Sequence, residues 1–157
     1  MFWLLDMDVF RVTFIGHRVI YNIRYIEDKI EELALGFLHK YQFVEFNLGR
    51  NGDFDICAAS AIKRAQLKCG TQNSSINLIL PYKSNDESYL ESFYDGIYYP
   101  LNSKTHFKSA ITKRNMWMID NADLLICYVE KTRQGGAFTA LKYAEKQRIQ
   151  TINLANE

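Results

Sequence analysis

The sequence predicts an α/β fold in which a mainly parallel sheet of about five strands lies between two layers of helices. Two observations predict it. Short apolar runs rich in β-branched residues alternate with longer segments whose apolar residues recur every three or four positions, as strands and amphipathic helices do. Several of the short runs also stop directly at a glycine or a proline. Because 157 residues is about the length of one domain, residues 1–157 are expected to form a single domain.

The first half of the chain contains two of the predicted strands, each followed by a helix. Residues 12–15 form a short apolar run that stops at Gly16. Between residues 23 and 37, isoleucine, leucine and phenylalanine recur at helical spacing and leave charged residues for the solvent. Residues 43–48 form the next strand, and the alanine-rich segment 58–65 is predicted to pack as a helix close against the sheet.

The second half returns to this alternation after a long interruption. Residues 76–80 form a third strand that Pro81 closes, and residues 124–129 form a fourth. Helices are predicted from Phe107 to about Asp120 and from Ala137 to about Lys146, and a last strand over residues 151–154. This order predicts a three-layer, Rossmann-like domain with helices on both faces of the sheet.

Two segments do not follow the alternation. Residues 82–106 are predicted to be a long, partly ordered loop, because a polar start leads into a tyrosine-rich stretch. Such a loop is either a lid or interface, or an insertion packed by its own aromatic residues. Residues 1–9 have three open interpretations: an extra edge strand, a partner-binding arm, or a loosely docked tail.

The charge balance and the cysteines argue against several classes of protein. A formal net charge of +1 gives no broad basic surface, which argues against nucleic acid as a partner. Cys57, Cys69 and Cys127 are odd in number and far apart, so neither a disulfide framework nor a zinc site is expected. Charged residues interrupt the apolar N-terminus early, so a cytoplasmic protein without a membrane span is expected.

No sequence pattern points to a metal, a cofactor or a known catalytic motif. The chain contains no Walker-type phosphate loop, no Gly-x-Ser-x-Gly elbow and no cluster of metal-ligating residues. We therefore predict no catalytic residue, no metal and no cofactor. A ligand is expected where open parallel sheets bind one, beyond the carboxyl ends of the strands.

Three turns lie at such positions, each between a predicted strand and the next helix. They are Gly16-His17-Arg18, the turn 49–53 and the turn 134–137. The pair Gly135-Gly136 is the best candidate for an anion cradle, because glycines let the backbone approach an anion and the following helix supplies N–H donors. Thr139, further along that helix, either adds a hydroxyl to the anion or bonds to its own backbone.

The other polar candidates have two interpretations each. Arg18 suits a phosphate or a carboxylate on the ligand. His17 is either a ligand contact or a polar residue that local backbone satisfies. Asp55 either stabilises the start of its helix or accepts hydrogen bonds from a ribose. Arg114 and Asn115 lie beside apolar residues of a helix, either on a solvated face or at the ligand.

Taken in order, these motifs resemble those of the SLOG superfamily. The residues that carry the resemblance are Phe14-Ile15-Gly16-His17-Arg18, Gly52-Asp53-Phe54-Asp55 with Ala58-Ala59, Arg114-Asn115 with Met118, and Gly135-Gly136 with Thr139 and Tyr143-Ala144. The resemblance runs from about residue 12 to residue 154 and is strongest for small stand-alone members of the YpsA-like branch. It implies a Rossmann-like domain that binds nucleotides or their derivatives, often as a dimer.

Members of the superfamily differ in function. Some are LONELY GUY-type phosphoribohydrolases that release a base from a nucleoside monophosphate, and others are sensors of NAD-derived signals such as cyclic ADP-ribose in anti-phage defence. In the hydrolase motif Pro-Gly-Gly-x-Gly-Thr-x-x-Glu, Gly135, Gly136 and Thr139 match. Lys142 stands in place of the catalytic glutamate, and a lysine has the wrong charge to stabilise a developing oxocarbenium ion. Binding without rapid turnover is therefore expected.

The expected function is binding of a nucleotide or nucleotide-derived signal by a homodimer or higher oligomer that acts as a sensor or sequestering protein. The expected ligand-binding residues are Gly16, His17, Arg18, Asn51, Gly52, Asp55, Arg114, Asn115, Gly135, Gly136 and Thr139. The alternative is a phosphoribohydrolase-type enzyme with an altered motif. A third class, the single-stranded nucleic-acid binders among the DNA-processing relatives, is disfavoured by the near-neutral charge.

Overall fold

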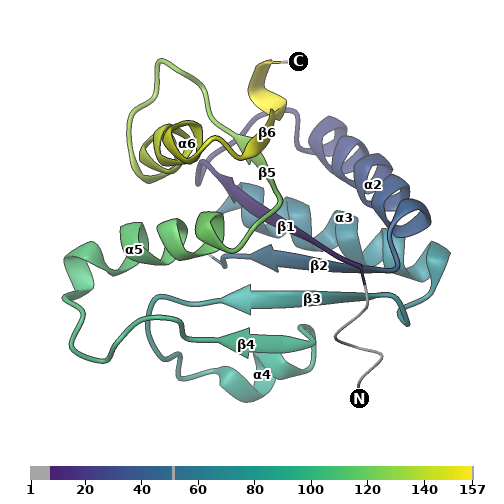
Figure 1. The fold of residues 1–157 in the computed structure, drawn as a ribbon, viewed down its shortest axis with the longest axis horizontal. Coiled ribbons are helices and arrows are strands. Elements are labelled where there is room, and N and C mark those ends of the chain that lie inside the picture. Colours follow the sequence, from purple (N-terminus) through teal and green to yellow (C-terminus); the bar gives the residue numbers. More distant parts are fainter. Residues whose placement is uncertain (1–7, 51, 157) are drawn as a thin grey trace.

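A computed structural model describes residues 8–50 and 52–156 of the chain. Within these residues, six strands form one parallel sheet in the order β4-β3-β2-β1-β5-β6 (Figure 1). The strands are β1 (Val9–Gly16), β2 (Phe43–Leu48), β3 (Ser74–Ile79), β4 (Gly96–Tyr98), β5 (Leu124–Tyr128) and β6 (Gln150–Asn153). A Rossmann-like α/β fold is thereby confirmed.

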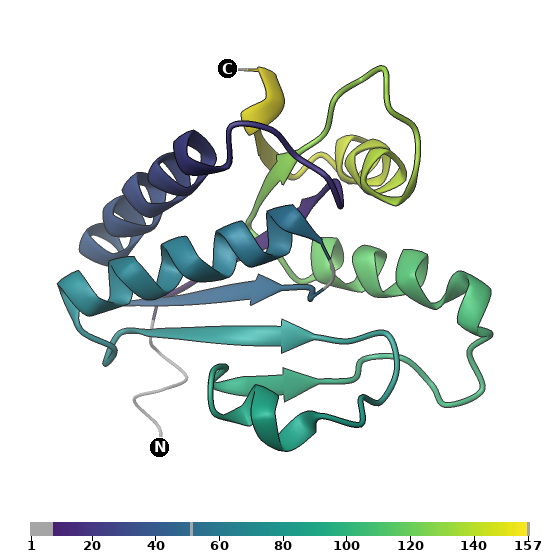
Figure 2. The same cartoon turned by 180° about the vertical axis from the view of Figure 1, so that it is seen from behind.

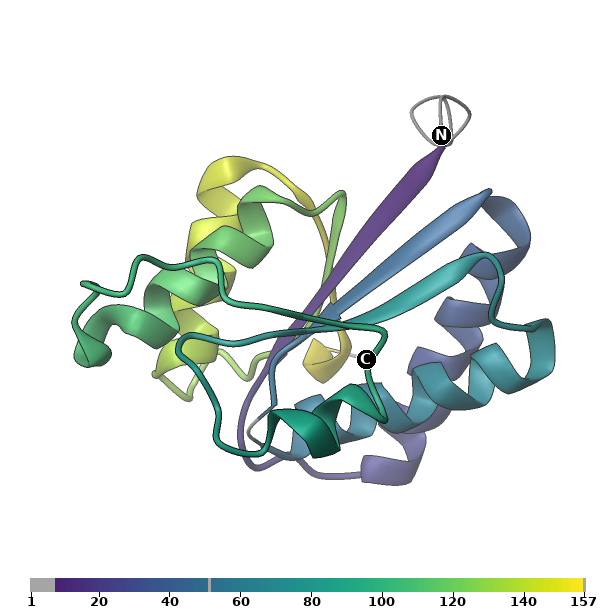
Figure 3. The same cartoon turned by 90° about the horizontal axis from the view of Figure 1, so that it is seen from below.

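Helices cover both faces of this sheet (Figures 2 and 3). The helices are α2 (Ile23–Lys40), α3 (Asp53–Cys69), α4 (Glu87–Glu91), α5 (Phe107–Asp120) and α6 (Gly136–Gln147), and a 3-10 turn, η1, follows at Leu154–Asn156. Figure 3 shows α5 and α6 on one side of the sheet, with α2, α3 and α4 on the other.

The central strand β1 shows why both faces need a cover. Successive side chains of a strand point to opposite faces of its sheet. Phe14 belongs to the large core cluster beneath α2 and α3, whereas Ile15, the next residue, belongs to the cluster beneath α5 and α6. Both are buried. A strand that is apolar on both faces produces the continuous apolar run that predicted it from the sequence.

The segment 82–106 is more regular than predicted. It contains the helix α4 and the edge strand β4, which pairs with β3 and raises the strand number to six. Leu90 packs with Leu78 and Leu80 in a small cluster of its own, so the helix has an apolar anchor. The interpretation as a long loop is therefore wrong for the part that α4 and β4 occupy.

The start of β1 and the membrane-span prediction can also be compared with the structure. β1 begins at Val9, three residues before the predicted strand, and the interpretations of residues 1–9 fall mostly on residues 1–7, outside the described part of the chain. In that described part, no helix combines the length and apolarity that crossing a membrane requires. The predicted cytoplasmic location stays a prediction.

The strand order determines where a ligand can enter. β1 lies between β2 and β5, so the chain runs outward to one side of β1 and later returns to build the sheet on its other side. The loops that follow β1 and β5 therefore diverge and leave a crevice at the carboxyl ends of the strands. Open α/β sheets bind ligands at such a switch point.

Candidate functional site

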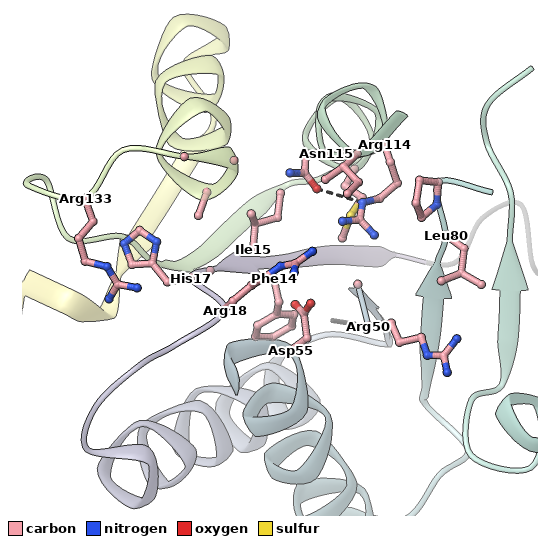
Figure 4. A pocket seen from close by; sticks show the side chains of 18 of the residues that line it. Phe14, Ile15, His17, Arg18, Arg50, Asp55, Leu80, Arg114, Asn115 and Arg133 are labelled. Carbon is pink, nitrogen blue, oxygen red and sulfur yellow. Dashed lines mark hydrogen bonds between the residues drawn. The ribbon is translucent and has the colours of Figure 1, made fainter. Parts of the chain in front are cut away.

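A cavity of about 300 Å³ lies at this switch point, beyond the carboxyl ends of β1, β2 and β3 (Figure 4). It is lined by Phe14, Ile15, Gly16, His17, Arg18, Gly49, Arg50, Asp55, Leu80, Pro81, Ile111, Arg114, Asn115, Met118, Arg133, Gln134, Gly135, Gly136 and Ala137. These residues come from the ends of the strands, from the starts of α3 and α6, and from the middle of α5.

The cavity is strongly cationic although the whole chain is nearly neutral. Arg18, Arg50, Arg114 and Arg133 line it, whereas Asp55 is the one acidic residue among the lining residues. A cleft lined by one sign of charge concentrates field lines and attracts a ligand of the opposite sign. The composition of the lining therefore favours an anionic ligand.

Arg18 is the arginine best placed to bind that ligand. Its side chain is exposed, and in the described part of the chain its guanidinium makes no hydrogen bond or ion pair. Its backbone is held firmly, because Arg18 O accepts a hydrogen bond from Asp53 N at 2.7 Å. Gly52 packs against it so closely that an added Cβ would lie 2.8 Å from Arg18 Cα. The backbone of Arg18 is therefore fixed, while its guanidinium has no partner among the described residues and can bind a ligand.

Arg114 and Asp55 meet above Gly49. A Cβ added to Gly49 would lie 3.1 Å from both Arg114 Nη1 and Asp55 Oδ2. Arg114 also donates from Nη1 to Ile79 O at 2.9 Å and from Nε to Asn115 Oδ1 at 3.0 Å, so its side chain is fixed. Burial lowers the pKa of Arg114, and the nearby Asp55 carboxylate acts in the opposite direction. Figure 4 shows Arg18, Asp55 and Arg114 converging on the centre of the cavity.

His17 is fixed by local backbone. Its Nε2 accepts a hydrogen bond from Glu130 N at 2.9 Å, and its own backbone N–H donates to Tyr128 O at 3.2 Å. Burial, followed by the charge of Arg133, lowers the pKa of His17 below its ordinary value. A neutral ring is the form that accepts from an amide, so the pKa direction and the hydrogen bond agree. The hydrogen bond from Glu130 N therefore matches the second interpretation of His17, a polar residue whose hydrogen bond comes from nearby backbone.

Arg50 and Arg133 also line the cavity and are missing from the predicted ligand-binding residues, although the predicted turn 49–53 contains Arg50. Arg50 donates from Nη1 to Ser84 Oγ at 2.9 Å and to Asp86 Oδ1 at 3.0 Å. Arg133 pairs with Glu130 at 3.2 Å. The Ser84 hydroxyl and Arg50 together lower the pKa of Asp86. Each of these two arginines therefore already has a carboxylate partner that does not line the cavity.

The start of α6 faces the cavity with its backbone exposed. Gly135, with φ at +142°, precedes the helix, and a Cβ on Gly135 or Gly136 would meet no atom within 4 Å. No side chain caps this helix, and its first turn contains no acidic residue. The first turn of α3, in contrast, contains Asp53 and Asp55. Of the two helices that begin at the cavity, α6 is the one whose positive dipole end has no acidic residue in its own first turn.

The structure brings most of the predicted site residues together. Those that line the cavity are Gly16, His17, Arg18, Asp55, Arg114, Asn115, Gly135 and Gly136. Gly52 lies behind Arg18 rather than at the cavity, and Asn51 falls outside the described residues. Thr139 donates from its hydroxyl to Gly135 O at 3.0 Å, which is the local backbone bond of its two interpretations. Lys142 is exposed and pairs with Glu145 at 3.4 Å.

The two missed arginines differ in how visible they are in the sequence. Arg50 directly follows Gly49, the residue after β2, as His17 directly follows Gly16 at the end of β1. Its turn, 49–53, is one of the three expected at the ligand, so the same rule could have included Arg50. Arg133 lies in a loop whose path depends on contacts with Glu130 and with Val19 O, and no sequence signal marks it.

Comparisons with known proteins give a fold and no family. No family model and no curated protein matches the sequence. A solved structure of DNA processing protein A from Helicobacter pylori, described for its single-stranded DNA binding mode, has 18% sequence identity and a TM-score of 0.63. The likeness covers 95% of this chain and 66% of that one, so the chain spans just under two thirds of that protein.

The structure of TM1055, a structural genomics target, has 13% identity and a TM-score of 0.55, over 90% of this chain and 72% of that one. At these identities the likeness is one of fold, and it supports the Rossmann-like part of the predicted resemblance. It does not reach the finer assignment to the YpsA-like branch.

One expectation about partners needs correction. The net charge predicts that nucleic acid is not a partner, yet a protein described for single-stranded DNA binding has this fold. The physical error lies in averaging: a net charge of +1 is compatible with a cavity that contains four arginines, because acidic residues elsewhere balance them. Binding depends on the local charge at the surface that meets the ligand.

Proposed function

We propose that this chain binds a phosphate-bearing nucleotide in the arginine-lined cavity. The observation that carries the proposal is the guanidinium of Arg18, which has no hydrogen-bond or ion-pair partner among the described residues and lines the same cavity as the uncapped start of α6. A guanidinium and a row of backbone N–H groups at a helix start are the two kinds of donor that bind phosphate best in proteins. Both are open to a ligand here.

The rest of the cavity suits the other parts of a nucleotide. The Asp55 carboxylate lies at the centre, where it can accept hydrogen bonds from ribose hydroxyls (Figure 4). Leu80, Pro81, Ile111 and Met118 form an apolar wall against which a base can pack. A volume of about 300 Å³ is at the lower end of the range for small-molecule sites and suits a mononucleotide or one end of a larger ligand.

Binding without rapid turnover is the form of the function that the lining favours. Glycoside hydrolysis generally needs two carboxyl groups on either side of the scissile bond. Among the lining residues, Asp55 alone is acidic, and Lys142, at the position of the hydrolase glutamate, does not line the cavity. A sensor or sequestering protein of the YpsA-like kind, responding to a nucleoside monophosphate or an ADP-ribose-like signal in anti-phage defence, is the finer form of this proposal.

Single-stranded nucleic acid is the second candidate ligand. The specific observation in its favour is the shared fold with DNA processing protein A. A nucleotide unit of a strand presents the same phosphate, sugar and base to the cavity as a free nucleotide does. The two candidates therefore use one site and differ in what lies beyond it.

A thermal-shift screen of the purified chain tests the proposal. The probes are AMP, ADP-ribose, NAD, cyclic ADP-ribose and a short oligonucleotide, with adenosine as the control that lacks phosphate. A ligand at about one hundred times its dissociation constant adds roughly 2.7 kcal/mol to the unfolding free energy, which raises the midpoint of a domain of this size by several degrees. We expect a shift with phosphate-bearing probes and none with adenosine.

The variant Arg18→Ala locates the site. We expect it to weaken binding of the phosphate-bearing probe about tenfold or more, because a charge-assisted hydrogen bond is lost. Arg24→Ala removes another exposed arginine, from α2 and outside the cavity, and should leave affinity unchanged. Equal affinity of wild type and Arg18→Ala, or equal shifts with AMP and adenosine, would count against the proposal.

A further inference from the structure

A stretch of the chain beside the cavity contains basic residues and no acidic ones. Between Asp95 and Asp120 there is no aspartate or glutamate, whereas Lys104, Lys108 and Lys113 occur together with Arg114. Lys104, Lys108 and Lys113 are exposed. The acidic residues that make the whole chain nearly neutral therefore lie elsewhere. This stretch includes α5, which forms one wall of the cavity.

One face of α5 continues from the cavity onto this basic surface. Ile111, Arg114 and Met118 line the cavity and are spaced three and four residues apart, so they share a helix face. Phe107 lies four residues before Ile111, on the same face, and is 69% exposed. Its ring stacks on His106 with the centroids 5.0 Å apart. The cavity wall thus extends outward as an exposed aromatic ring.

A second exposed aromatic ring follows β3. Tyr82 comes directly after Pro81, which lines the cavity, and is 55% exposed; Lys83 beside it is exposed too. Figures 1 and 2 both place the start of α5 and the segment after β3 on the same side of the molecule, beyond the carboxyl ends of the strands. Two exposed aromatic rings, Tyr82 and Phe107, therefore flank the cavity wall.

We propose that Tyr82, Lys83, Lys104, Phe107 and Lys108, here called the aromatic-basic rim, bind a single-stranded nucleic acid whose terminal or flipped-out nucleotide occupies the cavity. Aromatic rings interleaved with cations are the elements by which proteins hold single strands: bases stack on the rings, and lysines contact the phosphates. The inference rests on the proposed function, because the strand enters the same cavity, and it adds the surface beyond that cavity.

Fluorescence anisotropy with labelled dT12 and U12, and competition by dTMP and UMP, tests this rim. We expect the strands to bind at least tenfold more tightly than the mononucleotides, because additional bases and phosphates meet the rim. Phe107→Ala and Tyr82→Ala should each weaken strand binding about tenfold and leave mononucleotide binding unchanged. Both residues are exposed, so the unfolding midpoints of these variants should match that of wild type.

Tyr25→Ala is the matched control. Tyr25 is 48% exposed on α2, across the sheet from α5, and its removal should change neither affinity. Strands that bind no more tightly than mononucleotides, or rim variants with wild-type strand affinity, overturn the rim while the nucleotide site stands. Mononucleotides that fail to bind overturn the proposed function instead. If both strands bind more tightly than the mononucleotides, the rim is supported, and the tighter of dT12 and U12 identifies the sugar that the rim prefers.

Discussion

At the scale of single residues, glycines decide how closely the walls of the cavity approach one another. Gly16 ends β1 and lines the cavity, and a Cβ added to it would lie 2.4 Å from Phe54 Cγ. Phe54 is fully buried at the start of α3 and belongs to the large core cluster. The turn after β1 can therefore lie against α3 only because residue 16 has no side chain.

The variant Gly16→Ala should destabilise the fold. The new methyl group must displace a core ring, and overpacking of this kind costs about 1–3 kcal/mol of unfolding free energy. Gly36→Ala is the matched control, since Gly36 is exposed inside α2 with no atom within 4 Å of an added Cβ; it should gain roughly 0.5–1 kcal/mol. Urea unfolding measures both. Equal stability of the Gly16→Ala variant and wild type would contradict the packing account.

His17 gives the stability a pH dependence with a definite sign. Burial lowers its pKa in the folded chain, so the unfolded chain takes up the proton more readily. The contribution of neutral His17 to the unfolding free energy is fully present above the unfolded pKa of about 6.5. It is lost as the pH falls from there toward the lower pKa of the folded chain. His17→Gln should flatten this part of the profile, because a glutamine does not titrate.

Unfolding free energies at pH 7.5, 6.5 and 5.5 measure this effect. His39→Gln, on the exposed end of α2, is the control and should keep the slope of wild type. A His17→Gln variant whose stability falls with pH as steeply as that of wild type would show that the carboxyl groups of the chain, rather than this histidine, produce the slope.

At the scale of elements, the sequence predicts what local pattern determines and misses what tertiary contacts determine. The strand over Phe43–Leu48 and the helix over Phe107–Asp120 were predicted at or near their observed bounds, since each has a long apolar pattern and a glycine, proline or polar end. α4 and β4 are too short for any period to show. Their stability comes from Leu90 and from Asp95, which accepts a hydrogen bond from Ile76 N at 2.8 Å.

The same distinction applies to the cavity. Gly16, Gly135 and Gly136 could be predicted because a glycine between a parallel strand and the following helix has a known place in this fold. For Thr139 the sequence leaves two interpretations open, and its hydroxyl makes the local one, a hydrogen bond to Gly135 O. The position of Arg133 depends on the path of a loop, which no local pattern fixes.

A test of the α4–β4 unit follows from its small core. Leu90→Ala removes a buried side chain, at a cost of about 2 kcal/mol or more, from a cluster that contacts the rest of the molecule through β3. We expect local opening, seen as amide hydrogen exchange of Leu80, whose N–H donates to Tyr98 O, faster by about thirtyfold.

The hydrogen-exchange rates of amides in the central strand β1 should change far less in the same variant. Leu67→Ala, which truncates a leucine that is 85% exposed on α3, should change neither set of amides. Equal acceleration of the Leu80 amide and of the β1 amides would show that α4 and β4 unfold only together with the whole sheet.

At the scale of the whole molecule, charge is segregated rather than absent. Four acidic residues lie close together on α2: Glu27, Asp28, Glu31 and Glu32. Arg64 and Lys68 on α3 pair with some of them, which uses these charges within the helix layer away from the cavity. The arginines of the cavity and the lysines of the aromatic-basic rim lie instead beyond the carboxyl ends of the strands, where a ligand can reach them.

This segregation predicts a salt dependence that the net charge does not. Each phosphate of a single strand that the protein neutralises contributes about −0.7 to the slope of log affinity against log salt concentration. Lys104→Ala/Lys108→Ala removes two exposed cations of the rim, so the slope for dT12 should become shallower by about 1.4. Lys40→Ala/Lys146→Ala removes the same charge from the carboxyl-terminal ends of α2 and α6, which precede the amino ends of β2 and β6, away from the cavity at the carboxyl ends of the strands. That control should keep the slope of wild type, since its lysines contact no phosphate.

An equal change of slope in both double variants would mean that overall charge, and not the rim, attracts the strand.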